Sequence, residues 1–123
     1  MDVKDIKFKA KTLALHNWAE GDLLHMNGRT YIRKDNVIFA DVDLDTVCMF
    51  TGLKDKDGKE IYEHDIISII EGRKPCEVIF EKGCFLAFNP KTLIRMPLIR
   101  GIDYYAWELH VVGNKFDKES KAY

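Results

Sequence analysis

The stretch that decides the fold is residues 49–67, Met-Phe-Thr-Gly-Leu-Lys-Asp-Lys-Asp-Gly-Lys-Glu-Ile-Tyr-Glu-His-Asp-Ile-Ile. An apolar run rich in β-prone residues enters the charged turn at residues 55–58. The segment Ile-Tyr-x-x-Asp-Ile-Ile then leads back to apolar residues. Gly58 closes the charged run, and glycine favours tight turns because it tolerates positive φ. The order of these residues predicts strands that re-enter a core on both sides of a glycine turn.

The N-terminal segment carries an equally regular pattern. Ile6, Phe8 and Ala10 alternate with lysines, which is the period-2 pattern of a half-buried strand. The lysines would then line one solvent face. A lysine-lined edge strand resists pairing with other chains, and we prefer this interpretation to a row of nucleic-acid contacts.

Two dipeptides predict β-hairpins. Asn27-Gly28 lies between apolar runs and supplies two residues that tolerate the positive φ of a type I′ turn. Lys82-Gly83 is a second such signal. A two-residue loop there would place Phe80 opposite Phe85 across the ladder.

The rest of the chain repeats short strands separated by turn signals. We expect further strands over residues 36–40, 46–51, 66–70, 77–80, 84–88 and 107–112. No long segment has the 3.6-residue period of a helix, so residues 91–99 and 62–65 are the places for a minor one. The fold class is therefore mainly β, or α+β with a minor helix, built as a small barrel or a pair of packed sheets.

Composition bounds the class of protein. A length of 123 residues suits one domain or two small lobes, and the net charge of -1 argues against a dedicated phosphate-backbone binder. No apolar run reaches the roughly 18 residues that a membrane span requires, and no secretion signal opens the chain. We therefore expect a cytoplasmic protein without a membrane partner. The odd set Cys48, Cys76 and Cys84 is interpreted as small apolar fillers of strands.

The sequence predicts no catalytic, cofactor or metal site. A calcium loop with Gly58 at its sixth position would put Leu53 at the first and His64 at the twelfth, so both anchoring carboxylates are missing. Cysteines and histidines have no spacing typical of a zinc site, and no nucleophile, Walker or zinc-protease motif occurs. We expect a protein that is not an enzyme and carries no cofactor.

Several of these segments resemble the YopX family, which is a family of small proteins encoded by phages and prophages. The resemblance rests on residues 49–67, on the opening residues 6–10, and on two later segments at 78–85 and 110–114. Family members commonly have Glu-Gly-Asp where this chain has Glu63-His64-Asp65. The signature turn consists of eight residues, namely Gly52, Leu53, Asp55, Asp57, Gly58, Ile61, Tyr62 and Asp65.

The resemblance implies an SH3-like barrel in the C-terminal part of a β-rich fold. The chain would be a single domain, 1–123, or would contain an N-terminal β lobe (1–50), a C-terminal barrel (51–114) and a polar tail (115–123). The family brings no activity and no catalytic residues. Its bacterial setting agrees with a cytoplasmic location in the host cell.

Two hypotheses about function follow. The first is a non-enzymatic accessory protein that contacts a host or phage protein, or forms a homo-oligomer. The second is a nucleic-acid-binding module, because small β-barrels with basic loops and exposed aromatics bind single strands. Arginines and aromatics are also enriched in protein interfaces, so both hypotheses use the same surface. Its residues are Arg95, Arg100, Tyr104, Tyr105 and Trp107.

Overall fold

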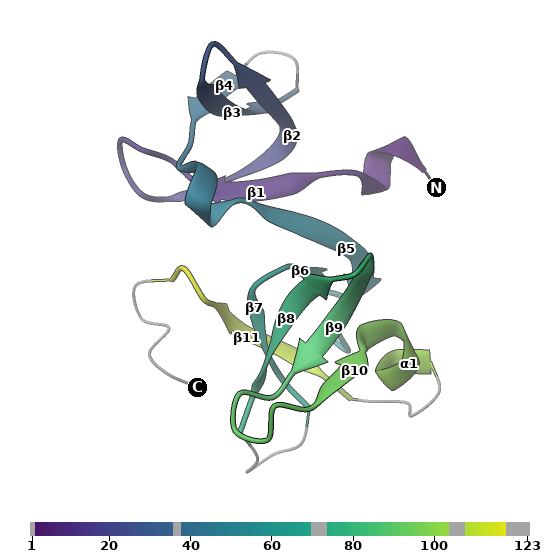
Figure 1. Cartoon of the computed structure of the whole chain (residues 1–123). Helices are drawn as coiled ribbons and strands as arrows, with labels where there is room; N and C mark the ends of the chain where they lie inside the picture. The colour runs from purple at the N-terminus through teal and green to yellow at the C-terminus, as the bar shows by residue number, and fades with distance from the viewer. Residues whose placement is uncertain (1, 36–37, 70–73, 104–107, 118–123) are drawn as a thin grey trace. The chain divides into compact units, whose positions relative to one another are not determined.

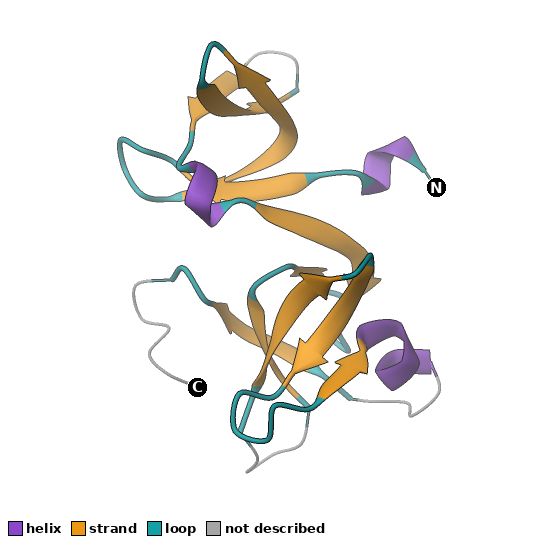
Figure 2. Cartoon of the chain, in the orientation of Figure 1, coloured by secondary structure: helices purple, strands orange, loops and turns teal. Residues whose placement is uncertain are grey.

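The computed structural model describes residues 2–35, 38–69, 74–103 and 108–117. Within these ranges the chain is mainly β, with one short α-helix and two 3-10 turns (Figures 1 and 2). It forms two compact units, which are unit 1 (Met1–Phe50) and unit 2 (Thr51–Tyr123). The predicted mainly β fold class is confirmed.

Unit 1 is a curled antiparallel meander in which each strand pairs with the next along the chain. A bridge between Thr12 and Val42 brings the end of the last meander strand back to the first. Ala10, Ile32 and Val42 form its buried cluster. Its elements are η1 (Val3–Asp5), β1 (Phe8–Lys11), β2 (Trp18–Met26), β3 (Arg29–Lys34), β4 (Ile38–Asp41), η2 (Leu44–Thr46) and the start of β5 (Cys48–Lys54).

The lysine-bearing strand β1 lies inside its sheet. It pairs with β2 on one side and with β5 on the other, so the prediction of an edge strand is wrong. Lys9 and Lys11 place their ammonium groups over the Trp18 ring, each 4.7 Å from its centroid. The alternation predicted the strand correctly, whereas the number of its neighbours depends on pairing with residues far away in the chain.

Unit 2 packs an antiparallel sheet and a short helix around one core. The sheet has the order β10-β9-β8-β7-β11, and β6 pairs with the end of β5 (Figure 1). Ile61, Ile67, Val78, Ala87, Leu98 and Leu109 form the buried cluster. The elements are β6 (Glu60–Tyr62), β7 (Asp65–Ser68), β8 (Cys76–Glu81), β9 (Cys84–Phe88), β10 (Arg95–Pro97), α1 (Leu98–Asp103) and β11 (His110–Asn114).

Both predicted hairpins are confirmed. Met26 pairs with Arg29 around Asn27-Gly28, where φ is 53° and 76°. Lys82-Gly83 has φ of 52° and 78°, and Phe80 lies opposite Phe85 with ring centroids 4.8 Å apart. These turns form as predicted because local φ preferences alone select them.

The minor helix overlaps the predicted range 91–99 only at the last two residues of that range, and no helix forms at 62–65. Residues 62–65 form a turn between β6 and β7, and α1 begins only at Leu98, directly after Pro97. Leu98 is fully buried in the core of unit 2, so tertiary packing rather than periodicity fixes this one-turn helix.

The described strands form two antiparallel sheets that do not close into a barrel, and the SH3-like barrel is not confirmed. Cys48 is buried in β5, while Cys76 and Cys84 begin β8 and β9 as free thiols. No described helix is long and apolar enough to cross a membrane. The polar tail beyond residue 117 lies outside the described residues.

Candidate functional site

The predicted basic and aromatic surface is only partly described. Tyr104, Tyr105 and Trp107 lie outside the described residues. Arg100 is exposed on α1, and Arg95 begins β10. The structure therefore does not test whether the five residues form one surface.

Arg95 is held against the sheet by its neighbours. Its Nε lies 3.1 Å from Glu81 Oε1, and its guanidinium carbon lies 4.8 Å from the centroid of the Phe88 ring. Nη1 also donates to the carbonyl of Leu93 (3.3 Å). The carboxylate of Glu81 balances the charge of Arg95, so this residue is less suited to a phosphate contact than its sequence context predicts.

The signature turn is built around Asp55. Its Oδ1 accepts hydrogen bonds from the amides of Asp57 (2.9 Å) and Lys59 (2.8 Å), and the carbonyl of Asp55 accepts one from Gly58. Oδ2 accepts a hydrogen bond from the amide of Val111 in β11 at 3.0 Å. One nearly buried carboxylate thus closes the turn and joins it to a strand 56 residues away.

The same contacts set the ionisation of Asp55. Burial by itself would raise the pKa of this carboxyl, but hydrogen bonds from the amides of Val111, Lys59 and Asp57 outweigh it and lower the pKa below its ordinary value. The neighbouring His110 adds a smaller effect in the same direction. Asp55 is therefore a carboxylate near neutral pH.

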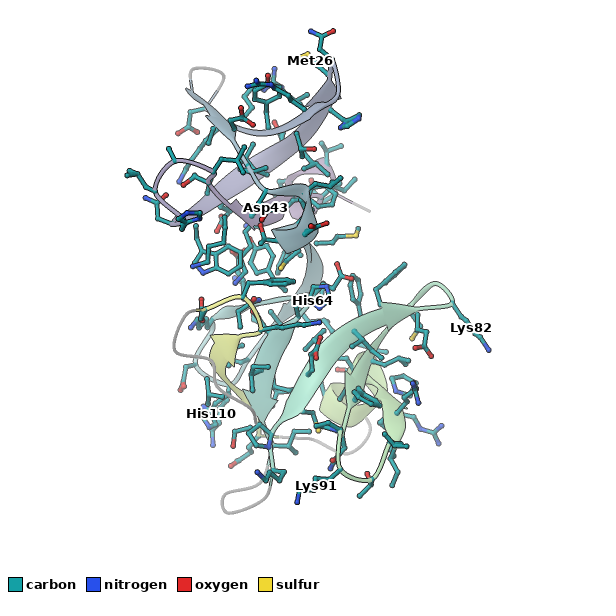
Figure 3. The ribbon with its side chains drawn as sticks, turned by 60° about the vertical axis from the view of Figure 1, so that its left-hand side comes forward. Met26, Asp43, His64, Lys82, Lys91 and His110 are labelled. Atoms are coloured by element: carbon teal, nitrogen blue, oxygen red, sulfur yellow. The ribbon has the colours of Figure 1, made fainter. Side chains whose placement is uncertain are left out.

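Asp57 and His110 extend the contact between the signature turn and β11 toward solvent. His110 Nδ1 lies 2.9 Å from Asp57 Oδ2, and one potential ligand atom from each of Asp55, Asp57 and His110 lies within 4.8 Å of the others (Figure 3, which labels His110). Beside them, Lys56 Nζ pairs with Glu108 Oε1 at 2.9 Å. Sequence spacing does not predict this cluster, because Asp57 and His110 meet only when β11 docks on the turn.

A second junction lies at the end of the signature. Asp65 is 1% exposed; its Oδ2 accepts a hydrogen bond from the amide of Tyr62 and its Oδ1 accepts one from the side-chain amide of Asn114, at 2.8 Å and 2.9 Å. Asn114 is also buried, and its Oδ1 accepts a hydrogen bond from the amide of Phe116. Asp65 thus caps the turn, and its partner Asn114 belongs to the later segment 110–114.

His64 is the third residue that contributes to this junction, after Asp65 and Asn114. Its φ is 70°, so the position that is commonly glycine in the family is left-handed here. Nδ1 lies 2.9 Å from Oε2 of the nearly buried Glu77, Nε2 lies 3.5 Å from Glu63 Oε2, and the Phe116 ring packs edge-on. These contacts offset the strain of a non-glycine residue in this region, which is about 1 kcal/mol or more.

The residues of the signature turn therefore hold β11 in place together. The structure places Leu53 and Ile61 against the core of unit 2 and gives Gly58 a φ of 82°. Gly52 also has a left-handed φ, and Tyr62 is buried. The sequence analysis missed His110, Glu77 and Asn114 as partners of the turn. The resemblance at residues 110–114 was a signal for His110 and Asn114, whereas Glu77 lies in none of the segments that carry the resemblance.

A family model described as YopX protein matches residues 1–119. The chain belongs to the YopX family. The match spans both the signature turn and the β11 segment on which it docks, so the contacts between Asp55 and Val111 and between Asp65 and Asn114 lie inside the matched region. None of the curated proteins compared with this YopX-family chain matches it.

Unit 2 also has a hydrogen-bonded loop at residues 89–94 that exposes two large apolar side chains. Leu93 and Ile94 are 64% and 61% exposed, although both are large and apolar. The side chain of Asn89 accepts hydrogen bonds from the amides of Lys91 and Thr92, and the Asn89 backbone exchanges hydrogen bonds with Leu93 and Ile94. Figure 3 labels Lys91 in this loop.

Unit 1 contains a separate apolar cleft of about 480 Å³ beside the β1–β2 loop. Leu13 and Leu15, 52% and 77% exposed, contribute to its lining. Among the described residues, the polar residues that line this cleft are Thr12, Asn17 and Asp41. The cleft is a second exposed apolar surface, so a substitution there can serve as a control for substitutions in the loop of unit 2.

Proposed function

We propose that this YopX-family chain is a non-enzymatic phage or prophage accessory protein that binds a host or phage protein through the loop at residues 89–94. The observation that carries the proposal is the exposure of Leu93 and Ile94 on a loop held by internal hydrogen bonds. Two adjacent large apolar side chains that are exposed to solvent rather than buried in the core are typical of an interaction surface.

The loop is built to hold these side chains in one conformation. Leu93 has a φ of 62°, which a leucine adopts only at a cost of about 1–2 kcal/mol. The hydrogen bonds of Asn89 and the bond from the Ile94 amide to Thr92 Oγ1 maintain that conformation. A surface that is ordered before binding loses less conformational entropy when a partner docks.

Arg95 adds a polar element at the edge of the loop. Its guanidinium lies over Phe88 and pairs with Glu81, so its position is fixed beside the exposed Leu93 and Ile94. Arginine beside apolar anchors is a common composition of interface hot spots. The proposal therefore retains Arg95 as a binding residue and adds Leu93 and Ile94 beside it.

Affinity capture with the full chain tests the proposal. Tagged protein would be incubated with lysates of host cells and of phage-infected cells, with and without nuclease, and bound proteins identified by mass spectrometry. The test variant is Leu93→Asn with Ile94→Ser, because asparagine tolerates positive φ and neither side chain is buried. Leu15→Ser in unit 1 is the matched control, since Leu15 is 77% exposed.

We expect a partner that survives nuclease, is retained by the control and is lost from the loop variant. Retention of the same partner by the loop variant would refute the role of residues 89–94. Size-exclusion chromatography with light scattering separates this outcome from self-association, which would give a mass that is a multiple of the 14.3 kDa chain.

Nucleic-acid binding is the second candidate. The contact of Lys9 and Lys11 with the Trp18 ring combines basic and aromatic groups on one face of β1 and β2. Partners that vanish with nuclease, and binding to single strands that weakens steeply with salt, would move this candidate to first place. A Lys9→Ala, Lys11→Ala variant that binds single strands as well as wild type would remove it.

The cytoplasm of a bacterial host and an SH3-like organisation of residues 51–114 belong to the same proposal. The location is consistent with family membership. The SH3-like organisation is consistent with family membership and with the antiparallel strands of unit 2. An experimental structure of unit 2 within the full chain, compared with known SH3-like barrels, would decide the second point.

A further inference from the structure

We propose that Asp55, Asp57 and His110 form a binding site for a divalent transition-metal ion of the zinc class. This site is distinct from the loop at residues 89–94 and does not depend on the proposed protein-binding role. It rests on the convergence of two carboxylates from the signature turn with an imidazole from β11, so that one ligand atom of each lies within 4.8 Å of the others.

The distance between the His110 and Asp57 ligand atoms suits a metal ion, and these two exposed side chains would turn toward Asp55, whose ligand atom lies within 4.8 Å of theirs, when an ion binds. Two ligands that each bind zinc at about 2.0–2.2 Å lie about 2.9–3.4 Å apart for angles between octahedral and tetrahedral. His110 Nδ1 and Asp57 Oδ2 are 2.9 Å apart, so they need to separate by only a few tenths of an ångström. The imidazole would carry its proton on Nε2 when Nδ1 binds the ion.

One ligand is fixed and two are accessible. Asp55 is held by three backbone amides, and within the described ranges its Oδ2 has a single hydrogen-bond partner, the amide of Val111. A carboxylate oxygen has two lone pairs, so Oδ2 retains one for an ion. The side chains of His110 and Asp57 are 44% and 72% exposed, which lets a hydrated ion reach them without unfolding the turn.

The surrounding charge favours a cation. Asp55, Asp57 and Glu108 supply three carboxylates, and among the described residues the ammonium paired with this group is that of Lys56, at 2.9 Å from Glu108. The charges of this group sum to about -2 with His110 neutral, which a divalent ion would neutralise. The ion would also link the signature turn to β11, in parallel with the hydrogen bond from Val111 to Asp55.

The donor set identifies the class of ion. One imidazole and two carboxylates match zinc and its neighbours in the transition series, whereas calcium and magnesium prefer sites made of oxygen alone. Three protein ligands leave at least one coordination position for water or for a group from a partner. We therefore expect zinc to bind more tightly than calcium.

Calorimetric titration of the metal-free full chain with zinc chloride tests the site. The test variants are His110→Ala and Asp57→Ala, both at exposed side chains. His16→Asn is the control, because His16 is exposed, has a φ of 55° that asparagine tolerates, and lies in unit 1. A parallel titration with cobalt distinguishes nitrogen and oxygen ligands from the free thiols of Cys48, Cys76 and Cys84 by their absorption.

We expect one zinc ion per chain, at least tenfold weaker binding in each test variant, and unchanged binding in the control. Thermal melts of each variant without metal would show that it folds. Absence of saturable binding by wild type, equal affinity of His110→Ala and wild type, or a thiolate absorption band with cobalt would each overturn the proposal. Tighter binding of calcium than of zinc would overturn the assigned class of ion.

Discussion

Replacing Asp55 by alanine tests whether one carboxylate joins the signature turn to β11. The variant loses three hydrogen bonds of 2.8–3.0 Å and leaves the amides of Asp57, Lys59 and Val111 without their acceptor. An unsatisfied buried donor costs about 1–3 kcal/mol. The Asp57 and Lys59 amides lie in an exposed turn where water can replace the carboxylate, so we expect a total loss of about 3 kcal/mol in the free energy of unfolding.

The pH dependence of this loss has a definite sign. Because the pKa of Asp55 is lowered in the folded protein, its stabilisation is fully present above the unfolded value of about 3.9. It diminishes as pH falls from there through the lowered folded value. The difference in stability between wild type and Asp55→Ala should therefore be largest near pH 7 and should shrink in acid.

Urea denaturation followed by circular dichroism measures the effect, with EDTA present so that no divalent ion contributes. Asp57→Ala is the matched control in the same turn, because its exposed pair with His110 contributes less than about 1 kcal/mol. Equal midpoints for Asp55→Ala and Asp57→Ala at pH 7 would refute the assigned role of Asp55. A difference that stays constant from pH 7 to about pH 3 would show that the charge of Asp55 is not its source.

Three further predictions concern unit 2. Gly58→Val should cost about 1–2 kcal/mol, since φ is 82° and no atom lies within 4 Å of an added Cβ, so an unchanged urea midpoint would contradict the backbone argument. Asp65→Ala should cost about 3 kcal/mol by removing the acceptor of the hydrogen bonds from the Tyr62 amide and from Asn114 Nδ2, and a thermal melt equal to wild type would exclude this anchor. Burial raises the pKa of the Cys76 thiol, so mass spectrometry should find it alkylated more slowly at pH 8 in the folded chain than in urea, and equal rates would show that burial does not protect it.

Local features of the fold are predictable from the sequence, and features that depend on long-range pairing are not. The Asn27-Gly28 and Lys82-Gly83 turns follow from residue preferences for positive φ, and the alternation around Phe8 predicts a strand. The same alternation does not show that β1 has a neighbour on each side. The start of helix α1 was predicted several residues too early, because the helix is stabilised by burial of Leu98 rather than by a periodic pattern.

The same distinction between local features and long-range contacts applies to the candidate sites. The turn at residues 55–58 is recognisable from its charged residues and glycine, yet the sequence gives Asp57 no partner. The imidazole of His110 reaches it because β11 pairs with β7, with His110 opposite Ser68, and because the Lys56 amide donates a hydrogen bond to the Leu109 carbonyl. Likewise, exposure of Leu93 and Ile94 is invisible in a sequence where both look like core residues.

The amino-acid sequence alone was enough to predict the mainly β class and the two hairpin turns, because both depend on short segments whose φ preferences and alternation act locally. It also carries the match to the YopX family over residues 1–119. Only the tertiary structure decided which distant groups meet: Asp55 with Val111, Asp65 with Asn114, and Asp57 with His110. The physical reason is that these contacts form between residues about 50 positions apart, where packing of the core of unit 2 selects the register of β11.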